Sequence, residues 1–141
     1  MDTIDAATRS RNMAAIPSRH TKPELALRSR LHRAGYRFRV HDRRLPGTPD
    51  IVLAKYRTVI EVRGCFWHRH PGCRYATTPK TRTEFWQSKF AANTARDRRN
   101  LAALESEGWQ VVVVWECELK RDADGVMERV EGALKSRIVD M

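Results

Sequence analysis

Residues 64–73, which read Gly-Cys-Phe-Trp-His-Arg-His-Pro-Gly-Cys, constrain the fold of this chain more than any other segment. Zinc prefers thiolate and imidazole ligands arranged in a tetrahedron. The spacing of Cys65, His70 and Cys73 suits three such ligands, and Cys117 is the candidate for the fourth. His68 is the alternative to His70 as the imidazole ligand. The segment therefore predicts a zinc knuckle that joins this loop to a distant part of the chain.

The composition points to a basic protein of one domain. The chain has 141 residues, and Lys+Arg 27 against Asp+Glu 17 gives a formal net charge of +10. Such a balance favours a polyanionic partner, and nucleic acid is the leading candidate; the alternative is a basic surface without a specific partner. No apolar run reaches the roughly 20 residues of a membrane span, and no signal peptide is evident. Because an odd number of cysteines suits a metal in a reducing compartment, we expect a cytoplasmic protein without disulfides.

Local patterns predict seven elements. Thr21-Lys-Pro-Glu24 is a capping box, followed by an apolar helical stripe that ends at Gly35. Glu24 falls on that stripe and is expected to point inward. Strands are predicted over 36–40, 50–54, 56–63 and 111–115, a turn over 43–49, and helices over 83–107 and 122–137.

This α-β-β-β-α-β-α order predicts an α/β fold with a mixed central sheet flanked by helices. The segment 111–115 is almost continuously apolar. We therefore expect its strand to be central in the sheet and covered on both faces.

A pattern of carboxylates forms a second candidate site. Pro49-Asp50 is followed, after ten residues, by Glu61-Val62-Arg63. Two carboxylates on adjacent strands, with the Val62 carbonyl oxygen between them, can bind Mg²⁺. A cation such as Arg63 can stabilise charge on a phosphate. This is the PD-(D/E)xK pattern of metal-dependent nucleases, with arginine in place of lysine; the alternative is a turn aspartate beside a surface Glu–Arg pair.

The long helix carries a stripe at three- and four-residue spacing, formed by Trp86, Phe90, Asn93, Asp97, Leu101 and Leu104. Asn93 and Asp97 interrupt it with polar groups that need partners if buried. Asp97 is predicted either to orient a histidine at an active site or to pair with an arginine on a solvated edge. Phe66 and Trp67 either cap the core or serve function, and their sequence neighbours are candidate ligands and charged residues.

Six motifs resemble those of the very-short-patch repair (Vsr) endonucleases, in the same order along roughly residues 6–120. They are Ala7-Thr-Arg-Ser-Arg-Asn-Met13, Leu45-Pro-Gly-x-Pro-Asp50, Gly64-Cys-Phe-Trp-His68, Lys80-Thr-Arg-Thr-Glu-Phe-Trp86, Asn93-x-x-Arg-Asp-Arg-Arg99, and Gly108-Trp109 through Val-Val-Trp115-Glu-Cys117.

The resemblance implies a bacterial repair enzyme with a restriction-endonuclease-like core. Such an enzyme recognises a T:G mismatch made by deamination of 5-methylcytosine, in double-stranded DNA, and nicks the strand 5′ to the thymine. It further implies Mg²⁺ as the catalytic ion and Zn²⁺ as a structural ion. We expect a monomer that binds double-stranded DNA with a T:G mismatch and does not bind a membrane. Mismatch-repair proteins are further candidate partners.

The resemblance also implies roles for individual residues. Asp50 would bind Mg²⁺ beside the Val62 carbonyl, Glu24 would reach that ion through water, and His68 would activate or position water with Asp97 as its partner. The structural zinc would be bound by Cys65, His70, Cys73 and Cys117. DNA would be contacted by Met13 and Ile16 from an arm at residues 1–20, and by Phe66, Trp67, Trp86 and Asn93 from the endonuclease domain at 21–141.

The sequence departs from the family pattern at several points. Glu61 replaces a non-acidic residue and Arg63 replaces a histidine, which leaves open how catalysis divides between His68 and these two. Pro71-Gly72, between His70 and Cys73, alters the spacing of the knuckle by one residue, and the C-terminus is short. Two other functions stay open, namely a mismatch-binding module with an inactive metal site, and a restriction- or homing-type nuclease that breaks both strands.

Overall fold

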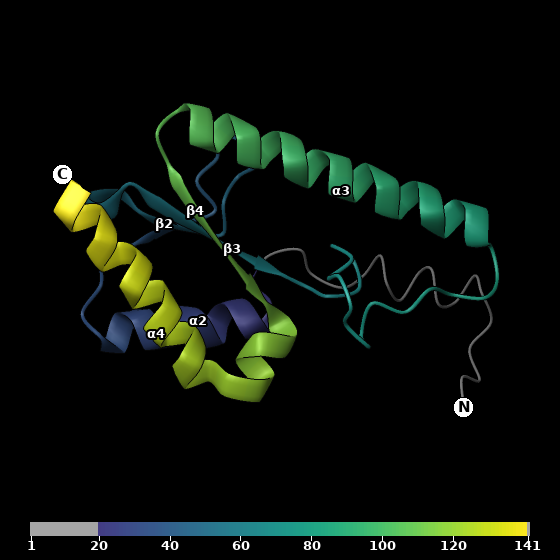
Figure 1. Ribbon diagram of the computed structural model, residues 1–141, viewed down its shortest axis with the longest axis horizontal. Coiled ribbons are helices and arrows are strands. Elements are labelled where there is room, and N and C mark those ends of the chain that lie inside the picture. Colours follow the sequence, from purple (N-terminus) through teal and green to yellow (C-terminus); the bar gives the residue numbers. More distant parts are fainter. Residues whose placement is uncertain (1–19, 141) are drawn as a thin grey trace.

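The computed structural model describes residues 20–140, and Figure 1 shows a sheet that lies between helices. Met13, Ile16 and all but the last residue of the predicted arm lie outside the described residues. The elements are α2 (Lys22–Arg33), β1 (Arg39–Val40), β2 (Ile51–Leu53), a short 3₁₀ turn (Ala54–Tyr56), β3 (Thr58–Arg63), α3 (Thr83–Ser106), β4 (Gln110–Trp115) and α4 (Glu116–Asp140). The predicted α/β class and order of elements are confirmed.

The first strands are shorter than their sequence patterns predicted. β1 covers only Arg39–Val40, because it has partners only at Val52 and Ile51 of β2. The 3₁₀ turn after Leu53 and the left-handed backbone of Arg57 (φ 50°) end β2 and delay the start of β3. Alternation of side chains therefore continued beyond the residues that have a pairing partner.

The sheet is mixed, as predicted, but β4 lies elsewhere in it than expected. The strand order is β1-β2-β3-β4, with antiparallel pairing up to β3 and parallel pairing between β3 and β4. Within the described residues β4 is thus an edge strand, and the prediction that it is central is wrong. The prediction that both its faces are covered is confirmed, because α3 packs on one face and α4 on the other. Helices on both faces, rather than strands on both sides, explain its apolar sequence.

The core is divided by the sheet. On one face, Leu27 and Leu31 of α2 and Val130 and Leu134 of α4 pack with Ile60 of β3. The capping box holds α2 at its start, where Thr21 Oγ1 accepts a hydrogen bond from the Glu24 backbone N–H.

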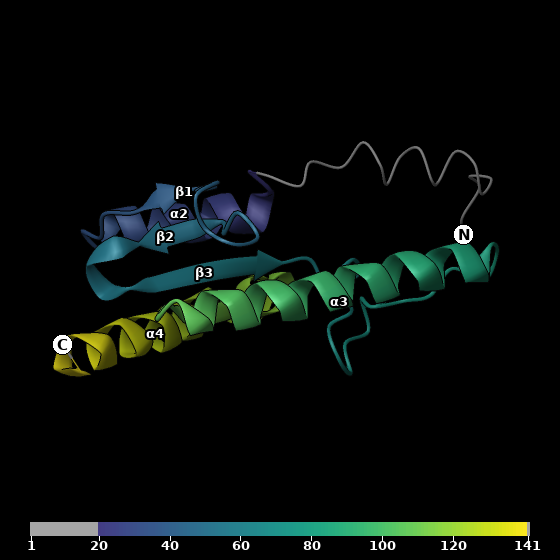
Figure 2. The ribbon, with the colours of Figure 1, turned by 90° about the horizontal axis from the view of Figure 1, so that it is seen from above.

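On the other face, Leu104 of α3 packs with Val52, Val59 and Trp109. The C-terminal part of α3 lies against this face, and the N-terminal half of α3 extends beyond the ends of the strands (Figures 1 and 2). Side chains of α3 therefore meet every second side chain of β2 and β3 on this face of the sheet.

The last helix is interrupted where the predicted helix 122–137 was expected to begin. Asp122 has a non-helical backbone (φ −155°, ψ 77°), and its Oδ1 accepts a 3.0 Å hydrogen bond from the Gly125 N–H. This is an N-cap for the second part of α4. Across residues 20–140, none of the helices is long and apolar enough to cross a bilayer.

Candidate active site and cysteine–histidine cluster

Asp50 and Glu61 are brought together by the antiparallel pairing of β2 and β3. Ile51 pairs with Ile60, so the next pair outward is Asp50 with Glu61. Both side chains lie on the α3 face of the sheet, because residues two apart on a strand share a face with Val52 and Val59. One oxygen of Asp50, Oδ2, accepts a 2.8 Å hydrogen bond from the Val62 backbone N–H. Neither carboxylate is the exposed group that the alternative interpretation required.

Burial shifts the protonation of both groups. It raises the pKa of Asp50 to about 6, despite the hydrogen bond from Val62. Burial, followed by repulsion from Asp50, raises the pKa of Glu61 to about 8, while the positive charge of Arg63 acts against this shift. Two half-buried carboxylates this close together are stabilised by a nearby cation. This donor set suits a hard divalent ion such as Mg²⁺.

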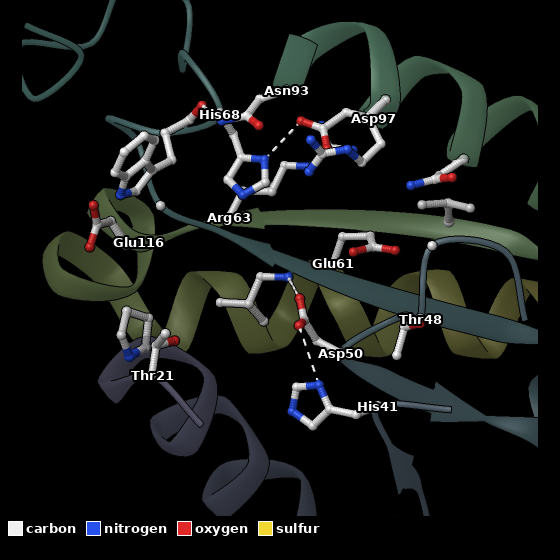
Figure 3. Close-up of a pocket in the computed structure, with 18 of the residues that line it drawn as sticks. Thr21, His41, Thr48, Asp50, Glu61, Arg63, His68, Asn93, Asp97 and Glu116 are labelled. Atoms are coloured by element: carbon white, nitrogen blue, oxygen red, sulfur yellow. Dashed lines mark hydrogen bonds and ion pairs between the residues drawn. The ribbon is translucent and has the colours of Figure 1, made fainter. Parts of the chain in front are cut away.

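His68 faces the same cleft from the other side and is paired with Asp97 of α3. The two side chains lie 2.8 Å apart, from His68 Nδ1 to Asp97 Oδ2 (Figure 3). Asp97 is thus the partner of a histidine, and in residues 20–140 no ion pair joins it to an arginine. A carboxylate can only accept, so Nδ1 carries the proton and the lone pair of a neutral ring is on Nε2.

A third group, Glu24, enters the site from α2, and it brings a residue that the sequence did not mark. Glu24 is fully buried, as its place on the helical stripe predicted. Its Oε2 lies 2.9 Å from His41 Nε2, and His41 Nδ1 lies 3.9 Å from Asp50 Oδ1. No motif includes His41, and only the fold brings it between two carboxylates that are far apart in the sequence.

Asp50, Glu61, His68, Asp97 and His41 line one open cleft of about 1040 Å³ between α2, α3 and the ends of the strands (Figure 3), and Glu24 lies buried behind His41. Basic side chains that line this cleft include those of Arg63, Arg96 and Lys120. Carboxylates and cations that line the same cleft suit a bound metal ion beside a phosphate backbone.

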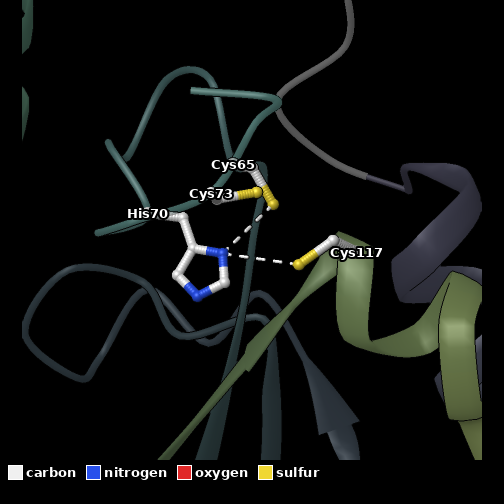
Figure 4. Close-up of side chains that lie close together, drawn as sticks. All are labelled: Cys65, His70, Cys73 and Cys117. Carbon is white, nitrogen blue, oxygen red and sulfur yellow. Dashed lines mark hydrogen bonds between the residues drawn. The ribbon is translucent and has the colours of Figure 1, made fainter. Parts of the chain in front are cut away.

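The three cysteines and His70 form a separate cluster. Their ligand atoms all lie within 4.8 Å of one another, and His70 Nδ1 is 3.6 Å from Cys65 Sγ and 3.4 Å from Cys117 Sγ (Figure 4). His68 points to Asp97 instead, so His70 is the imidazole that the fold offers. Three thiols and one imidazole at this spacing form a possible metal site. His70 also stacks on Trp115, with ring centroids 4.2 Å apart.

Phe66 and Trp67 are half-buried and lie against aromatic residues of α3. Phe66 contacts Trp86 and Phe90 at centroid distances of 5.8 and 5.2 Å, and Trp67 contacts Trp86 at 5.7 Å. Their neighbours in space are therefore apolar, although their neighbours in sequence are not. This aromatic cluster is separate from both core clusters. Asn93 donates a 3.3 Å hydrogen bond to the Trp67 carbonyl, so it contacts the loop rather than the core.

Arg69 organises the same loop and was not marked by the sequence. Its guanidinium lies over the Phe90 ring, 3.9 Å from the centroid. It donates to the carbonyls of Phe66, Ala76 and Thr77 and to the Thr78 hydroxyl. One half-buried cation thereby joins two parts of the loop to each other and to α3.

A cleft that brings two carboxylates and a histidine–aspartate pair together with arginine and lysine side chains is typical of a phosphodiester-cleaving nuclease, and this is the class of protein that the site indicates. Residues 1–74 match the family described as DNA mismatch endonuclease Vsr. The chain therefore belongs to the Vsr family of DNA mismatch endonucleases, and it is a DNA endonuclease.

Two relatives illustrate the similarity. The chain is 48% identical over 134 residues to DNA mismatch endonuclease Vsr of Escherichia coli, which covers 92% of this chain and 85% of that protein. It is 52% identical over 118 residues to the Type II nicking enzyme V.XorIIP of Xanthomonas oryzae pv. oryzae, which covers 84% of this chain and 86% of that protein. The resemblance identified from the motifs is confirmed.

Proposed function

We propose that this endonuclease nicks one strand of double-stranded DNA, 5′ to the thymine of a T:G mismatch, by Mg²⁺-dependent hydrolysis. The observation that carries the proposal is the placement of Asp50 and Glu61 across one cleft from the His68–Asp97 pair, beside the aromatic cluster. Relatives in Xanthomonas oryzae and Neisseria meningitidis are named nicking enzymes. These names favour a nick over the double-strand break of a restriction- or homing-type nuclease.

Asp50, Glu61 and the Val62 carbonyl would bind the catalytic ion. Burial raises the pKa of both carboxylates, with added repulsion from Glu24 on Asp50 and from Asp50 on Glu61, so a cation would relieve an unfavourable site. When bound, Mg²⁺ would polarise the scissile phosphate and acidify water. Arg63 would add positive charge near the phosphate, and Glu24 would contact the ion's water shell from α2.

The His68–Asp97 pair would handle the proton. Asp97 accepts from Nδ1, which leaves His68 Nε2 free to take a proton from the attacking water. His68 is about one-third exposed, whereas Asp97 is less exposed. The histidine can therefore meet water in the cleft, and its partner keeps the ring oriented.

The aromatic cluster would find the mismatch. A T:G pair offers a weak difference in hydrogen bonding at its edges, but a mismatched step is easier to unstack than a matched one. Phe66 and Trp67 pack against aromatic rings of α3, namely Trp86 and Phe90. This packing would fix their positions when they insert between DNA bases. Met13 and Ile16 on the arm at residues 1–20 would enter from the other groove.

The remaining assignments complete the proposal. Zn²⁺ would be bound by Cys65, His70, Cys73 and Cys117, and would hold the loop against the start of α4. Residues 21–141 would form one restriction-endonuclease-like domain that acts as a monomer. Mismatch-repair proteins are candidate partners.

A nicking assay on T:G and T:A duplexes, each with and without Mg²⁺, tests the proposed function. The expected result is a single-strand nick in the T:G duplex that requires Mg²⁺. Binding without cleavage would indicate an inactive mismatch-binding module. Breaks in both strands of the matched duplex would indicate the restriction-type alternative.

A further inference from the structure

His41 lies between two carboxylates that belong to different parts of the fold. Its Nε2 is 2.9 Å from Glu24 Oε2, and its Nδ1 is 3.9 Å from Asp50 Oδ1. The Asp50 side of this contact is drawn in Figure 3. The His41 side chain is only 9% exposed, so few water molecules can replace these neighbours.

Glu24 is a firm anchor for the His41 ring. Its Oε1 accepts a 3.2 Å hydrogen bond from the His20 backbone N–H, and its Oε2 faces Arg28 Nη1 at 3.2 Å. The Glu24 side chain is 2% exposed, and its backbone belongs to the first turn of α2. Because the carboxylate can only accept, His41 Nε2 donates to it, and this hydrogen bond sets the orientation of the ring.

The backbone of His41 is also tied to Asp50. The His41 N–H donates to the Asp50 carbonyl at 3.2 Å, and His41 adopts a left-handed backbone with φ 49°. This conformation is uncommon for a histidine and persists where surrounding contacts determine it. The backbone conformation of His41 therefore places its ring beside the Asp50 carboxylate.

The same atoms could be considered a cation site, but Arg28 argues against it. Ligand atoms of His20, Glu24 and His41 all lie within 4.8 Å of one another. Arg28 Nη1, however, is 2.9 Å from His20 Nδ1 and 3.2 Å from Glu24 Oε2. The guanidinium already supplies positive charge there, so these residues suit an anchor better than a metal centre.

We infer that His41 is a positioning residue that holds the Asp50 carboxylate in place for the catalytic cation, with Glu24 fixing the ring. The inference rests on the proposed function of the site. Asp50 Oδ2 accepts a hydrogen bond from the Val62 N–H, whereas the His41 ring packs against Oδ1 at 3.9 Å, a contact longer than a hydrogen bond that limits where this oxygen can move. A ligand that is oriented before the ion arrives loses less conformational freedom on binding.

The test is a titration of the zinc-loaded full chain with Mn²⁺ in the absence of DNA. The electron paramagnetic resonance signal of free Mn²⁺ measures how much of the ion has bound. His41→Asn tolerates the left-handed backbone but is too short to reach both carboxylates. His41→Gln keeps an amide that can donate to Glu24. The matched control is His32→Asn, at an exposed position of α2.

The expected result is an Mn²⁺ affinity about 10- to 100-fold weaker for His41→Asn, with recovery to within about threefold of the wild type in His41→Gln. The control should bind Mn²⁺ as the wild type does. In nicking assays, His41→Asn should need more Mg²⁺ for half-saturation, while its rate at saturating Mg²⁺ stays close to that of the wild type.

Unchanged Mn²⁺ affinity in His41→Asn would overturn the inference. If this variant does not fold, His41→Met takes its place with the same two outcomes, since it fills similar volume without a ring nitrogen. Asp50→Asn separates the inference from the proposed function. If Asp50→Asn loses Mn²⁺ binding while His41→Asn binds Mn²⁺ as the wild type does, only the role of His41 is rejected. If Asp50→Asn still binds Mn²⁺, Asp50 is rejected as the metal ligand.

Discussion

His68 Nδ1 and Asp97 Oδ2 lie 2.8 Å apart, which joins the loop after β3 to the middle of α3. The histidine comes from the segment that also carries the candidate zinc ligands and the aromatic pair. The aspartate comes from the helical stripe. One hydrogen bond therefore determines which His68 nitrogen faces the cleft, and it depends on the packing of α3 against the sheet.

Asp97→Asn should abolish most of the nicking activity while leaving DNA binding intact. An amide can donate to Nδ1, which would favour the ring tautomer that has its proton on Nε2 and cannot accept one from water. We expect the single-turnover rate on a T:G duplex to fall by about 10² to 10⁴. The control is Asp124→Asn, a surface partner of Arg30 with its side chain 90% exposed. A near-normal rate for Asp97→Asn would remove His68 from proton transfer.

Metal binding should depend on pH through Glu61. In the metal-free protein the pKa of Glu61 is raised to about 8, so its protonated form is favoured by folding. That contribution to stability is present at low pH and is lost as pH rises through about 8.

A divalent ion competes with the same proton, so affinity for Mg²⁺ should rise with pH between about 6 and about 8, the pKa values of Asp50 and Glu61. Titrations of Mg²⁺ across this range check the prediction. Glu61→Gln should keep only the part of the dependence that belongs to Asp50. A steep rise near pH 8 that persists in Glu61→Gln would show that Glu61 does not compete with the ion.

Loss of Cys117 should cost both zinc and stability. Cys117 joins the loop at 65–73 to the first residues of α4, where Glu116 Oε1 also accepts a hydrogen bond from the Cys65 N–H. Because binding of a structural metal contributes directly to folding, Cys117→Ser should lower the melting temperature and the zinc content together. Metal analysis and thermal unfolding, with and without a chelator, measure both. The assignment would be contradicted if the purified wild-type protein contained no zinc and Cys117→Ser had the same melting temperature as the wild type.

Phe66 and Trp67 should determine discrimination between mismatched and matched DNA. Replacing both by alanine should reduce the preference for T:G over T:A duplexes by about tenfold, a change of about 1.4 kcal/mol. Salt-dependent binding to matched DNA should remain, because it depends on the basic surface. Tyr75→Ala, at an exposed aromatic 43% accessible, is the matched control. Equal losses on both duplexes would show that the pair serves only to pack the loop.

The turn before Asp50 should be sensitive to any side chain at Gly47. This residue has φ 74°, and a Cβ there would lie 2.6 Å from Asn100 Nδ2 of α3. Backbone strain and overpacking together should cost about 2 to 4 kcal/mol in Gly47→Ala, measured by urea unfolding. Gly72 is the control, because it has φ 69° with open space around it, so alanine should cost only about 1 kcal/mol there. Adding Asn100→Ala to Gly47→Ala should recover the overpacking part.

Local features of the sequence determined much of this protein. The capping box and the inward Glu24, the stripe on α3, the grouping of Asp50 with Glu61 and the close spacing of Cys65, His70 and Cys73 all follow from neighbours within a few residues or from strands joined by a short turn. Such features are fixed by backbone geometry and hydrophobic periodicity, so they can be predicted from the chain alone.

Only the tertiary structure decided which distant segments meet. It placed β4 at the edge of the sheet. The apolar sequence of β4 reflects the helices that cover its two faces, and no periodicity in a sequence encodes the order of the strands. It brought His41 between Glu24 and Asp50, and it set Arg69 over Phe90. Each of these contacts depends on packing between elements, where burial and charge select the partner. The sequence pattern around His41 or Arg69 does not indicate which residue it will contact.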